Sequence, residues 1–382
     1  MYFLIFSFYL TLIILIYVYF GYPILLLVLK NFLKSEIKKD KTSLKCSLII
    51  TAFNEELCIE KKIKNSLKLN YPRSNLEIIV ALDGCTDSTE SIVKRYESQG
   101  VVLIKNQKHL GKTFVQFMAV EKAKGEILIF TDANAELEKN SVKIMMENYA
   151  DSDVGCVCGN LNYIKNNDIC GEGLYKKYEN FIKSLENSTN SIISAEGSFF
   201  SVRKKYYTQP CVSGGEDALL PFRVAKDKKK VIYEKEAMSF EEFLSNDTDQ
   251  IKRRARIVCR NLQLMSRMKE VLNPLAFGFF SIKFWSHKML RWLVPFFLIF
   301  LLVINICLLK YGIFYQVFLF IQIGFYLCAL IFPIIKEVFL VNKLKKIFYI
   351  PYFFCFSNLG IFLGFLYYFS GKKYQTWVPQ RT

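Results

Sequence analysis

The strongest constraint on this chain is an almost uninterrupted apolar run near its start, Phe3 to Leu29. A helix needs about 20 residues to cross the roughly 30 Å hydrocarbon core of a bilayer, and this run is long enough. A signal peptide would have a basic start and a small-residue cleavage site, whereas the lysines here follow the run. We therefore expect a retained membrane anchor.

A second apolar region follows residue 281, and we expect spans at 289–309, 313–335 and 347–369. The basic linker and basic middle domain should face the cytoplasm, which places the amino terminus outside. Three further spans would carry the basic tail outside, against the same tendency, so one span is expected to be re-entrant or interfacial. The aromatic and basic segment Leu272 to Trp292 is a good candidate for a helix in the interface.

Composition limits the class of protein and the kinds of metal or redox site that this chain can have. The 382 residues are 52% hydrophobic and carry a formal net charge of +17, which is unlike an ordinary soluble enzyme. The 11 cysteines are scattered, and Cys156 and Cys158 lack the C-x-x-C spacing of a zinc or redox site. His109 and His287 are too few for a histidine metal cluster, and we expect both to be structural.

The middle of the chain alternates strand and helix patterns. Strands are expected at 46–51, 77–81, 101–105 and 127–130, and helices at 55–67, 87–99 and 113–124. This alternation predicts an α/β domain with a parallel sheet covered on both faces. The expected organisation is a transmembrane helix at 1–29, a basic linker at 30–45, the α/β domain at 46–268, an interfacial amphipathic segment at 269–288, about three transmembrane helices within 289–369 and a basic tail at 370–382.

Polar residues follow three of these strands. They are the loop Thr51 to Glu55, the pair Asp83 and Gly84, and the pair Asp132 and Asn134. Open α/β sheets bind ligands at the carboxyl ends of their strands, so the three groups should share one edge. Asp132 and Asn134 are two apart in extended chain and point the same way, so their oxygens can hold a divalent cation and, through it, phosphates.

A short motif, Gly111-Lys112-Thr113, imitates the end of a phosphate-binding P-loop. That loop needs another glycine five residues before Gly111, where Asn106 stands, so a P-loop ATPase is excluded. Lys112 still opens a helix, where its ammonium and the helix amides could meet phosphate oxygens. The alternative is a solvated lysine at a helix start.

Taken in order, the segments TAFNEE, ALDGCTDST, HLGKT, FTDAN, GGED and QIKRRAR resemble a family-2 glycosyltransferase of the membrane-anchored kind that includes cellulose and hyaluronan synthases. The resemblance covers about Ser47 to Gln263. It implies a GT-A fold with a mostly parallel sheet, a nucleotide-sugar donor, with a UDP-sugar favoured, and a divalent metal, Mg²⁺ or Mn²⁺. It also implies inversion of the anomeric centre.

The resemblance assigns roles to individual residues. Asp217 would be the catalytic base, and Asp132, with Asn134, would take the metal and the diphosphate. The remaining substrate-binding residues would be Thr51, Ala52, Phe53, Glu55, Asp83, Lys112, Gln250, Arg253 and Arg254. Arginine pairs well with phosphate, although Arg253, Arg254 and Arg256 could instead form a basic helix face against anionic lipid. The loop 194–201 would shape the acceptor pocket, with core packing as the alternative for its two phenylalanines.

Three departures from the family pattern qualify these roles. Gly215 precedes Glu216 and Asp217 where similar enzymes often have threonine, and Asn134 replaces the second aspartate of D-x-D. Arg254 replaces the tryptophan of Q-x-x-R-W, which argues against a long processive product.

We therefore expect an inverting glycosyltransferase in the cell membrane, with several membrane passes and a cytoplasmic catalytic domain. Its acceptor would be lipid-linked or a growing saccharide, in surface polysaccharide or glycolipid synthesis, with membrane lipids and no nucleic acid as partners. Two alternatives remain open. One is single-sugar transfer to polyprenyl phosphate, and the other is a catalytically silent nucleotide-binding membrane protein.

Overall fold

The computed structural model describes residues 1–33, 36–164, 171–208, 215–242, 247–335, 342–372 and 374. The strands are β1 (Cys46–Ala52), β2 (Leu76–Asp83), β3 (Val101–Asn106), β4 (Ile127–Asp132), β5 (Glu136–Leu137), β6 (Val154–Ile164), β7 (Phe199–Arg203) and β8 (Lys230–Glu242). The helices of the middle domain are α3 (Ile59–Leu67), α4 (Thr89–Lys94), α5 (Lys112–Lys122), α6 (Ser141–Glu147), α7 (Gly171–Ser188), α8 (Glu216–Lys226) and α9 (Asp247–Arg267). The apolar ends form α1 (Tyr2–Ile16), α2 (Tyr22–Leu29), α10 (Pro274–Phe277), α11 (Phe279–Phe284), α12 (Leu290–Leu308), α13 (Ile313–Ile335) and α14 (Asn342–Phe369). Most of the predicted basic tail, 370–382, lies outside the described residues.

One mixed sheet organises the middle domain, in the order β3-β2-β1-β4-β7-β6-β8-β5. The four strands expected from the sequence are parallel and lie together, each within two residues of the predicted bounds. β7 then runs antiparallel to both β4 and β6, and β8 pairs parallel with β6. The register places Thr51 beside Asp132, so the ends of β1 and β4 share an edge as predicted.

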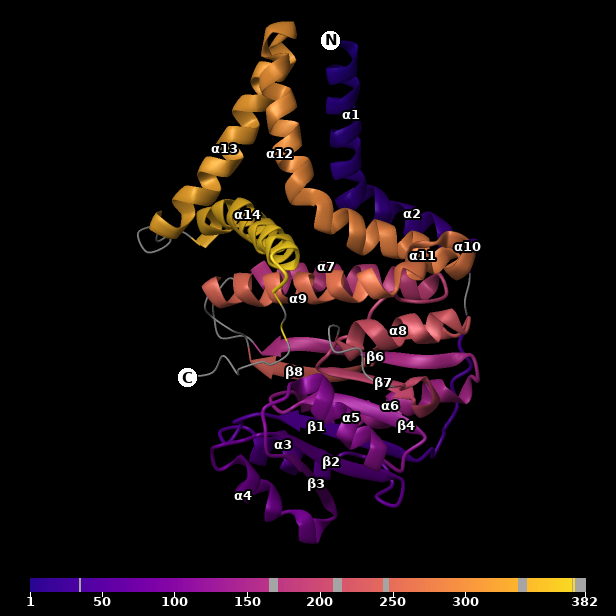
Figure 1. Ribbon diagram of the computed structural model, residues 1–382. Helices are drawn as coiled ribbons and strands as arrows, with labels where there is room; N and C mark the ends of the chain where they lie inside the picture. Colours follow the sequence, from indigo (N-terminus) through magenta and orange to yellow (C-terminus); the bar gives the residue numbers. More distant parts are fainter. Residues whose placement is uncertain are drawn as a thin grey trace.

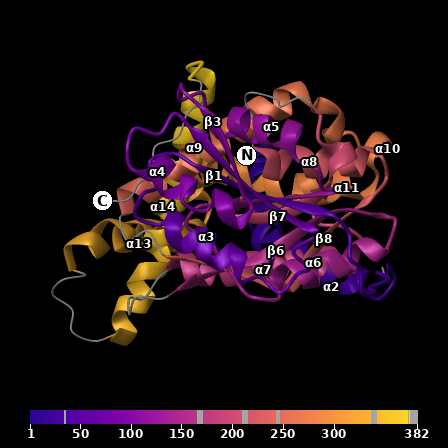
Figure 2. The same ribbon diagram turned by 90° about the horizontal axis from the view of Figure 1, so that it is seen from below.

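Helices cover both faces of this sheet. One core contains apolar side chains of α3, α4 and α6, and the other contains those of α5 and α8. Figure 2 shows the same division, with α5 and α8 on one side of the strands and α3 and α6 on the other. The side chains of β1 are buried throughout because both of its faces are covered.

In the part of the chain that the structure describes, four helices are long and apolar enough to cross a membrane, at Tyr2–Leu29, Phe279–Tyr311, Ile313–Ile334 and Phe348–Phe369. In Figure 1, α1, α12 and α13 rise away from the middle domain, whereas α14 lies across α9. The first two spans each contain a π-helical turn, at Tyr17–Gly21 and Trp285–Met289, where the chain bends. Consequently α2 and α11 run beside the middle domain rather than upward.

Close backbone packing joins α14 to α9. A Cβ atom added at Gly364 would lie 2.7 Å from the Cβ of Val258, so the glycine permits this approach. Just beyond α14, the carbonyl of Lys372 accepts a hydrogen bond from Gln263 Nε2 at 2.7 Å. The chain therefore returns to the middle domain after its last apolar helix.

Candidate active site

The carboxyl ends of β1, β2 and β4 carry the residues expected to hold the donor. Thr51 is 3% exposed and Ala52 is fully buried, so their side chains face the core. Phe53 is partly exposed and stacks on His109, with 3.7 Å between ring centroids. Within the predicted nucleoside loop, Phe53 is thus better placed for contact with a ligand than Thr51 or Ala52.

The carboxylate of Asp83 contacts the loop that precedes α5. It is fully buried, and its two carboxylate oxygens accept hydrogen bonds at 2.8 Å from the backbone amides of Leu110 and Gly111. His109 Nδ1 lies 2.9 Å from the same carboxylate. The oxygens of Asp83 thus fix the loop before α5, and its contact with the nucleoside stays a prediction.

Lys112 and Asp132 form an ion pair at the start of α5 and the end of β4. Both are partly exposed, at 27% and 33% of their side-chain surfaces. Burial lowers the pKa of Lys112, but the charges of Asp132 and then Asp217 outweigh burial and raise it. The predicted phosphate-binding lysine therefore stays cationic between the predicted metal ligand and the predicted base.

Glu241, near the end of β8, is a candidate site residue that the sequence analysis missed. It is 6% exposed, and its Oε1 atom is buried without a hydrogen-bond partner. Burial, followed by the charge of Asp132, raises its pKa to about 7. The signal available in the sequence was alternation along β8, which turns Ala237, Ser239 and Glu241 inward together.

Asp217, at the start of α8, has a carboxylate held between glycines. A Cβ atom at Gly197 would lie 3.3 Å from Asp217 Oδ2, and one at Gly215 would lie 2.1 Å from Oδ1. Burial raises the pKa of Asp217, which the charges of Lys112 and Arg260 partly oppose. The glycines give this carboxylate room to point away from the backbone, as a base requires.

Glu216, the neighbour of the predicted base, lies apart from solvent. It is 5% exposed, and its Oε2 accepts a hydrogen bond from Thr113 Oγ1 at 3.2 Å. Burial is the main reason that its pKa rises to about 7. Glu216 is therefore an internal group that packs α8 against the start of α5.

A cavity of about 600 Å³ lies between the middle domain and the apolar helices. Asp217, Ser194 and Glu196 line its inner side, and α9 contributes Gln250 and Arg253. Further walls come from Tyr19 in the π-helical turn after α1 and from α7, α8, α11, α12 and α14. All three residues predicted from the Q-x-x-R segment, Gln250, Arg253 and Arg254, thus meet the predicted base around one space.

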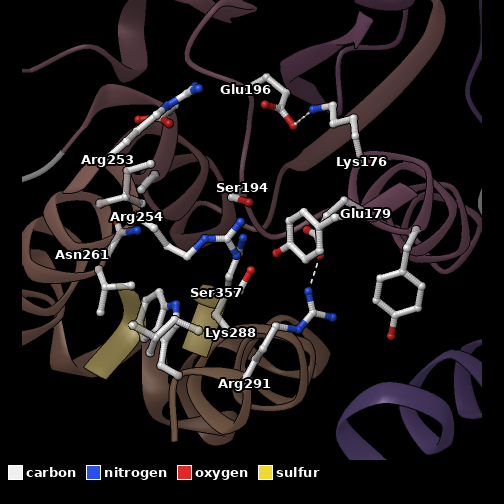
Figure 3. A pocket seen from close by; sticks show the side chains of 18 of the residues that line it. Lys176, Glu179, Ser194, Glu196, Arg253, Arg254, Asn261, Lys288, Arg291 and Ser357 are labelled. Carbon is white, nitrogen blue, oxygen red and sulfur yellow. Dashed lines mark hydrogen bonds and ion pairs between the residues drawn. The ribbon is translucent and has the colours of Figure 1, made fainter. Parts of the chain in front are cut away.

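The charges around this cavity are mainly positive. The cations are Lys176, Lys183, Arg253, Arg254, Arg260, Lys288 and Arg291, and the carboxylates are Glu179, Glu196 and Asp217. Figure 3 shows Lys176 on Glu196 and Arg291 directed toward Glu179. Glu196 also pairs with Lys183, and although burial opposes ionisation, the two lysines hold its pKa below the usual range.

The predicted acceptor loop 194–201 divides between two roles. Ser194, Ala195 and Glu196 line the cavity, whereas Phe199 and Phe200 lie in β7 and are at most 1% exposed. The aromatic rings therefore pack in the core, which was the alternative for them.

A buried ionic network joins the middle domain to the apolar helices. Arg291 on α12 pairs with Glu179 of α7, and His287 lies 3.2 Å from Glu179 and 2.8 Å from Glu186. Lys283 donates to the carbonyl oxygens of residues 186, 189 and 191 at the end of α7, at 2.7–2.9 Å. His287 is structural, as expected, but these contacts span about 100 residues and carry no local sequence signal.

Within the described residues, no group of three or more His, Cys, Asp and Glu side chains is arranged to hold a metal ion. Asp132 ends β4, Asn134 follows it by two residues, and Glu241 lies close enough to Asp132 to feel its charge. A cation here would need further ligands from substrate and water, as Mg²⁺ often does.

Comparison with known proteins identifies the domain. The Glycosyl transferase family 2 model matches residues 47–208. The chain is 30% identical over 166 residues to the GalNAc(5)-diNAcBac-PP-undecaprenol beta-1,3-glucosyltransferase of Campylobacter jejuni, covering 42% of this chain and 52% of that protein. It is 24% identical over 204 residues to glycosyltransferase GlyA of Streptococcus pneumoniae, covering 50% of this chain and 29% of that one. The chain thus spans about half, or less, of these relatives.

The fold is shared with a solved structure over nearly the whole chain. The mannosyltransferase PcManGT from Pyrobaculum calidifontis superposes with a TM-score of 0.72, covering 96% of this chain and 100% of that chain, at 17% identity. Identity this low shows a shared fold and nothing finer. Residues 47–208 therefore form a family-2 glycosyltransferase domain, and the middle domain has the GT-A fold.

Proposed function

We propose that this chain transfers a sugar, with inversion, from a nucleotide-sugar donor to a lipid-linked acceptor held at the membrane surface. One observation carries the proposal: a single cavity is lined by Asp217, by the Gln250–Arg253 segment and by the apolar helices α12 and α14. An acceptor with an apolar anchor could thus bring its hydroxyl to the base without leaving the membrane.

The proposed chemistry assigns Asp217 as the general base. The acceptor oxygen attacks the anomeric carbon, its proton passes to Asp217, and the bond from that carbon to the diphosphate oxygen breaks. Burial raises the pKa of Asp217 and so makes it a better proton acceptor. Negative charge grows on the departing diphosphate, and Lys112 and Arg253 are the cations placed to offset it.

We propose a divalent metal, Mg²⁺ or Mn²⁺, at Asp132 with Asn134, and we add Glu241. The residues fit such an ion, because Glu241 offers a buried unpartnered oxygen and lies close enough to Asp132 for the two charges to interact. Glu241 would replace the charge lost where Asn134 stands instead of aspartate. When bound, the metal would offset charge on the diphosphate. The PcManGT structure contains GDP-Man and Mn²⁺, which motivates the proposal.

The printed names of two relatives support a lipid-linked acceptor. The Campylobacter jejuni protein is named for an undecaprenol-diphosphate acceptor, and a Dictyostelium discoideum relative, 26% identical over 136 residues, is a dolichyl-phosphate beta-glucosyltransferase. For this chain we favour a UDP-sugar donor and a role in surface polysaccharide or glycolipid synthesis. We also propose a multi-pass protein with its catalytic domain in the cytoplasm, from the basic residues that follow the first span.

Donor turnover by the purified, detergent-solubilised chain tests the reaction. A panel of UDP- and GDP-sugars is assayed with Mn²⁺ or Mg²⁺ and membrane lipids, comparing wild type with Asp217→Asn. We expect one donor to release nucleoside diphosphate, and the variant to be slower by about 100-fold to 10,000-fold. Asp227→Asn, an exposed residue just after α8, is the matched control. Equal turnover in Asp217→Asn and wild type would refute the base assignment.

Mn²⁺ binding measured by electron paramagnetic resonance tests the metal site without catalysis. We expect Asp132→Asn and Glu241→Gln each to weaken binding in the presence of nucleoside diphosphate by at least about tenfold, because each removes a charged ligand. Glu242→Gln changes the exposed neighbour and should bind as wild type does. Unchanged binding in Glu241→Gln would remove Glu241 from the site.

A further inference from the structure

Arg291 is a buried cation whose hydrogen-bonding capacity is not filled. It is 6% exposed, and its Nη1 pairs with Glu179. Its Nε and Nη2 atoms are buried and have no geometrically ideal hydrogen-bond partner among the residues that the structure describes. Leaving buried polar groups unpaired destabilises a protein, so spare guanidinium N–H groups favour an acceptor from outside the chain.

The groups around Arg291 do not neutralise this part of the protein. Glu179 is shared with His287, which lies 3.2 Å away, so it does not belong to Arg291 alone. Two aromatic rings flank the guanidinium, those of Tyr19 and Tyr178, at 6.0 and 5.4 Å. Both rings lie close to the guanidinium charge, and Arg291 is one of the residues that line the cavity.

Two more cations line the same cavity. Lys288 lies one helical turn before Arg291, and it makes no hydrogen bond or ion pair with any residue that the structure describes. Arg254 projects from α9, with its guanidinium 5.0 Å from the ring centroid of Tyr175 and 5.8 Å from that of Phe353. Figure 3 shows Arg254 entering the cavity from one side, with Lys288 and Arg291 on the helix across from it.

The walls beside these cations are apolar. Trp292 of α12 and Phe353, Phe354 and Ile361 of α14 line the cavity, and both helices include candidate membrane spans. A ligand that satisfies these walls carries an anion at one end and a long hydrocarbon chain at the other. Arginine and lysine together with hydrocarbon match a phosphate monoester of a lipid alcohol better than a carboxylic acid on a sugar.

We propose that Arg254, Lys288 and Arg291 form a phosphate subsite that binds the phosphate or diphosphate of a lipid-linked acceptor, with the lipid chain lying along α12 and α14. The inference rests on the proposed function and names its acceptor class. The subsite is distinct from the Lys112–Asp132 pair proposed for the donor diphosphate, because neither of those two residues lines this cavity.

Binding of farnesyl phosphate to the full chain in detergent, without donor, tests the subsite. We expect saturable binding that raises the unfolding temperature, and a dissociation constant about tenfold weaker in Lys288→Gln and in Arg254→Gln. Both variants leave the Arg291–Glu179 pair in place. Lys252→Gln, with a lysine 70% exposed on α9, is the matched control and should bind as wild type does.

Two further probes separate the sources of the phosphate. Farnesol, which has the same chain and no charge, should bind much more weakly than farnesyl phosphate, and inorganic phosphate should compete only at far higher concentration. Equal binding in wild type and both variants would overturn the subsite, as would equal binding of farnesol. Inorganic phosphate competing as well as farnesyl phosphate would overturn the lipid assignment. Because no donor is present, these outcomes are independent of whether Asp217→Asn loses turnover.

Discussion

Glu216 should make the folded protein less stable as the pH rises through neutrality. Its pKa rises from 4.5 to about 7 in the folded chain, chiefly because it is buried. The unfolded chain loses this proton above pH 4.5, whereas the folded chain keeps it until about pH 7. Unfolding therefore releases a proton between these values, and stability falls as the pH increases.

The size of the effect follows from the pKa difference. Each pKa unit corresponds to about 1.4 kcal/mol, so full ionisation of Glu216 costs the folded state about 3 kcal/mol. Glu216→Gln keeps a neutral side chain of similar size whose amide oxygen can still accept from Thr113. At pH 8 we expect the variant to be more stable than wild type by about 3 kcal/mol, and at pH 4.5 nearly equal to it. For a domain of this size, that is an unfolding-temperature difference of about 6–12 °C.

Thermal unfolding followed by intrinsic fluorescence, in detergent from pH 4.5 to 8.5, measures this difference. Other groups titrate in both proteins, so the quantity to plot is the unfolding temperature of Glu216→Gln minus that of wild type. Glu97→Gln alters an exposed glutamate in the same domain and should give a flat difference. A flat difference for Glu216→Gln as well would refute the reasoning that burial holds the proton on this side chain.

Two further predictions concern close packing at glycines, and a third concerns the buried ionic network. Gly197→Ala should lower kcat about tenfold at unchanged donor KM, because the added Cβ would lie 3.3 Å from the carboxylate of Asp217, the proposed base. A Cβ added at Gly173 meets no described atom within 4 Å, so Gly173→Ala should match wild type in turnover assays. Gly364→Leu should lower the unfolding temperature by several degrees by forcing α14 from α9, and Gly324→Leu, with nothing within 4 Å, should not. His287→Ala should destabilise the chain by about 3 kcal/mol, since it leaves two buried carboxylates short of a partner; an unfolding temperature unchanged at constant pH would contradict this.

The sequence predicted those parts of the fold in which local pattern and global position agree. The first four strands are β-branched or apolar runs that end in polar clusters, and parallel pairing necessarily brings the ends of β1 and β4 to one edge. The order β7-β6-β8 could not be predicted in the same way. β7 pairs with β4 and lies between β4 and β6, and no local sequence pattern indicates that position.

The candidate site likewise contains residues that lie in recognisable motifs and residues that do not. Asp217 and Gln250 lie in motifs, and both line the cavity. Glu241 belongs to no motif, and its relation to Asp132 exists only because β8 crosses beside the end of β4–β5. Asp83 shows the converse, because its motif is recognisable while its carboxylate is engaged by amides that follow it by 27 and 28 residues.

The network of Glu179, Glu186, His287 and Arg291 also limits how this protein can be recombined with its relatives. The two acids come from the GT-A domain, and His287 and Arg291 come from the helix that enters the apolar region. A chimera that joins this domain to another relative's membrane helices would bury the acids without these partners. Exchange of the membrane helices should therefore succeed only where α7 and the segment 283–291 come from the same parent protein. The crossover points of such a chimera should lie outside both segments.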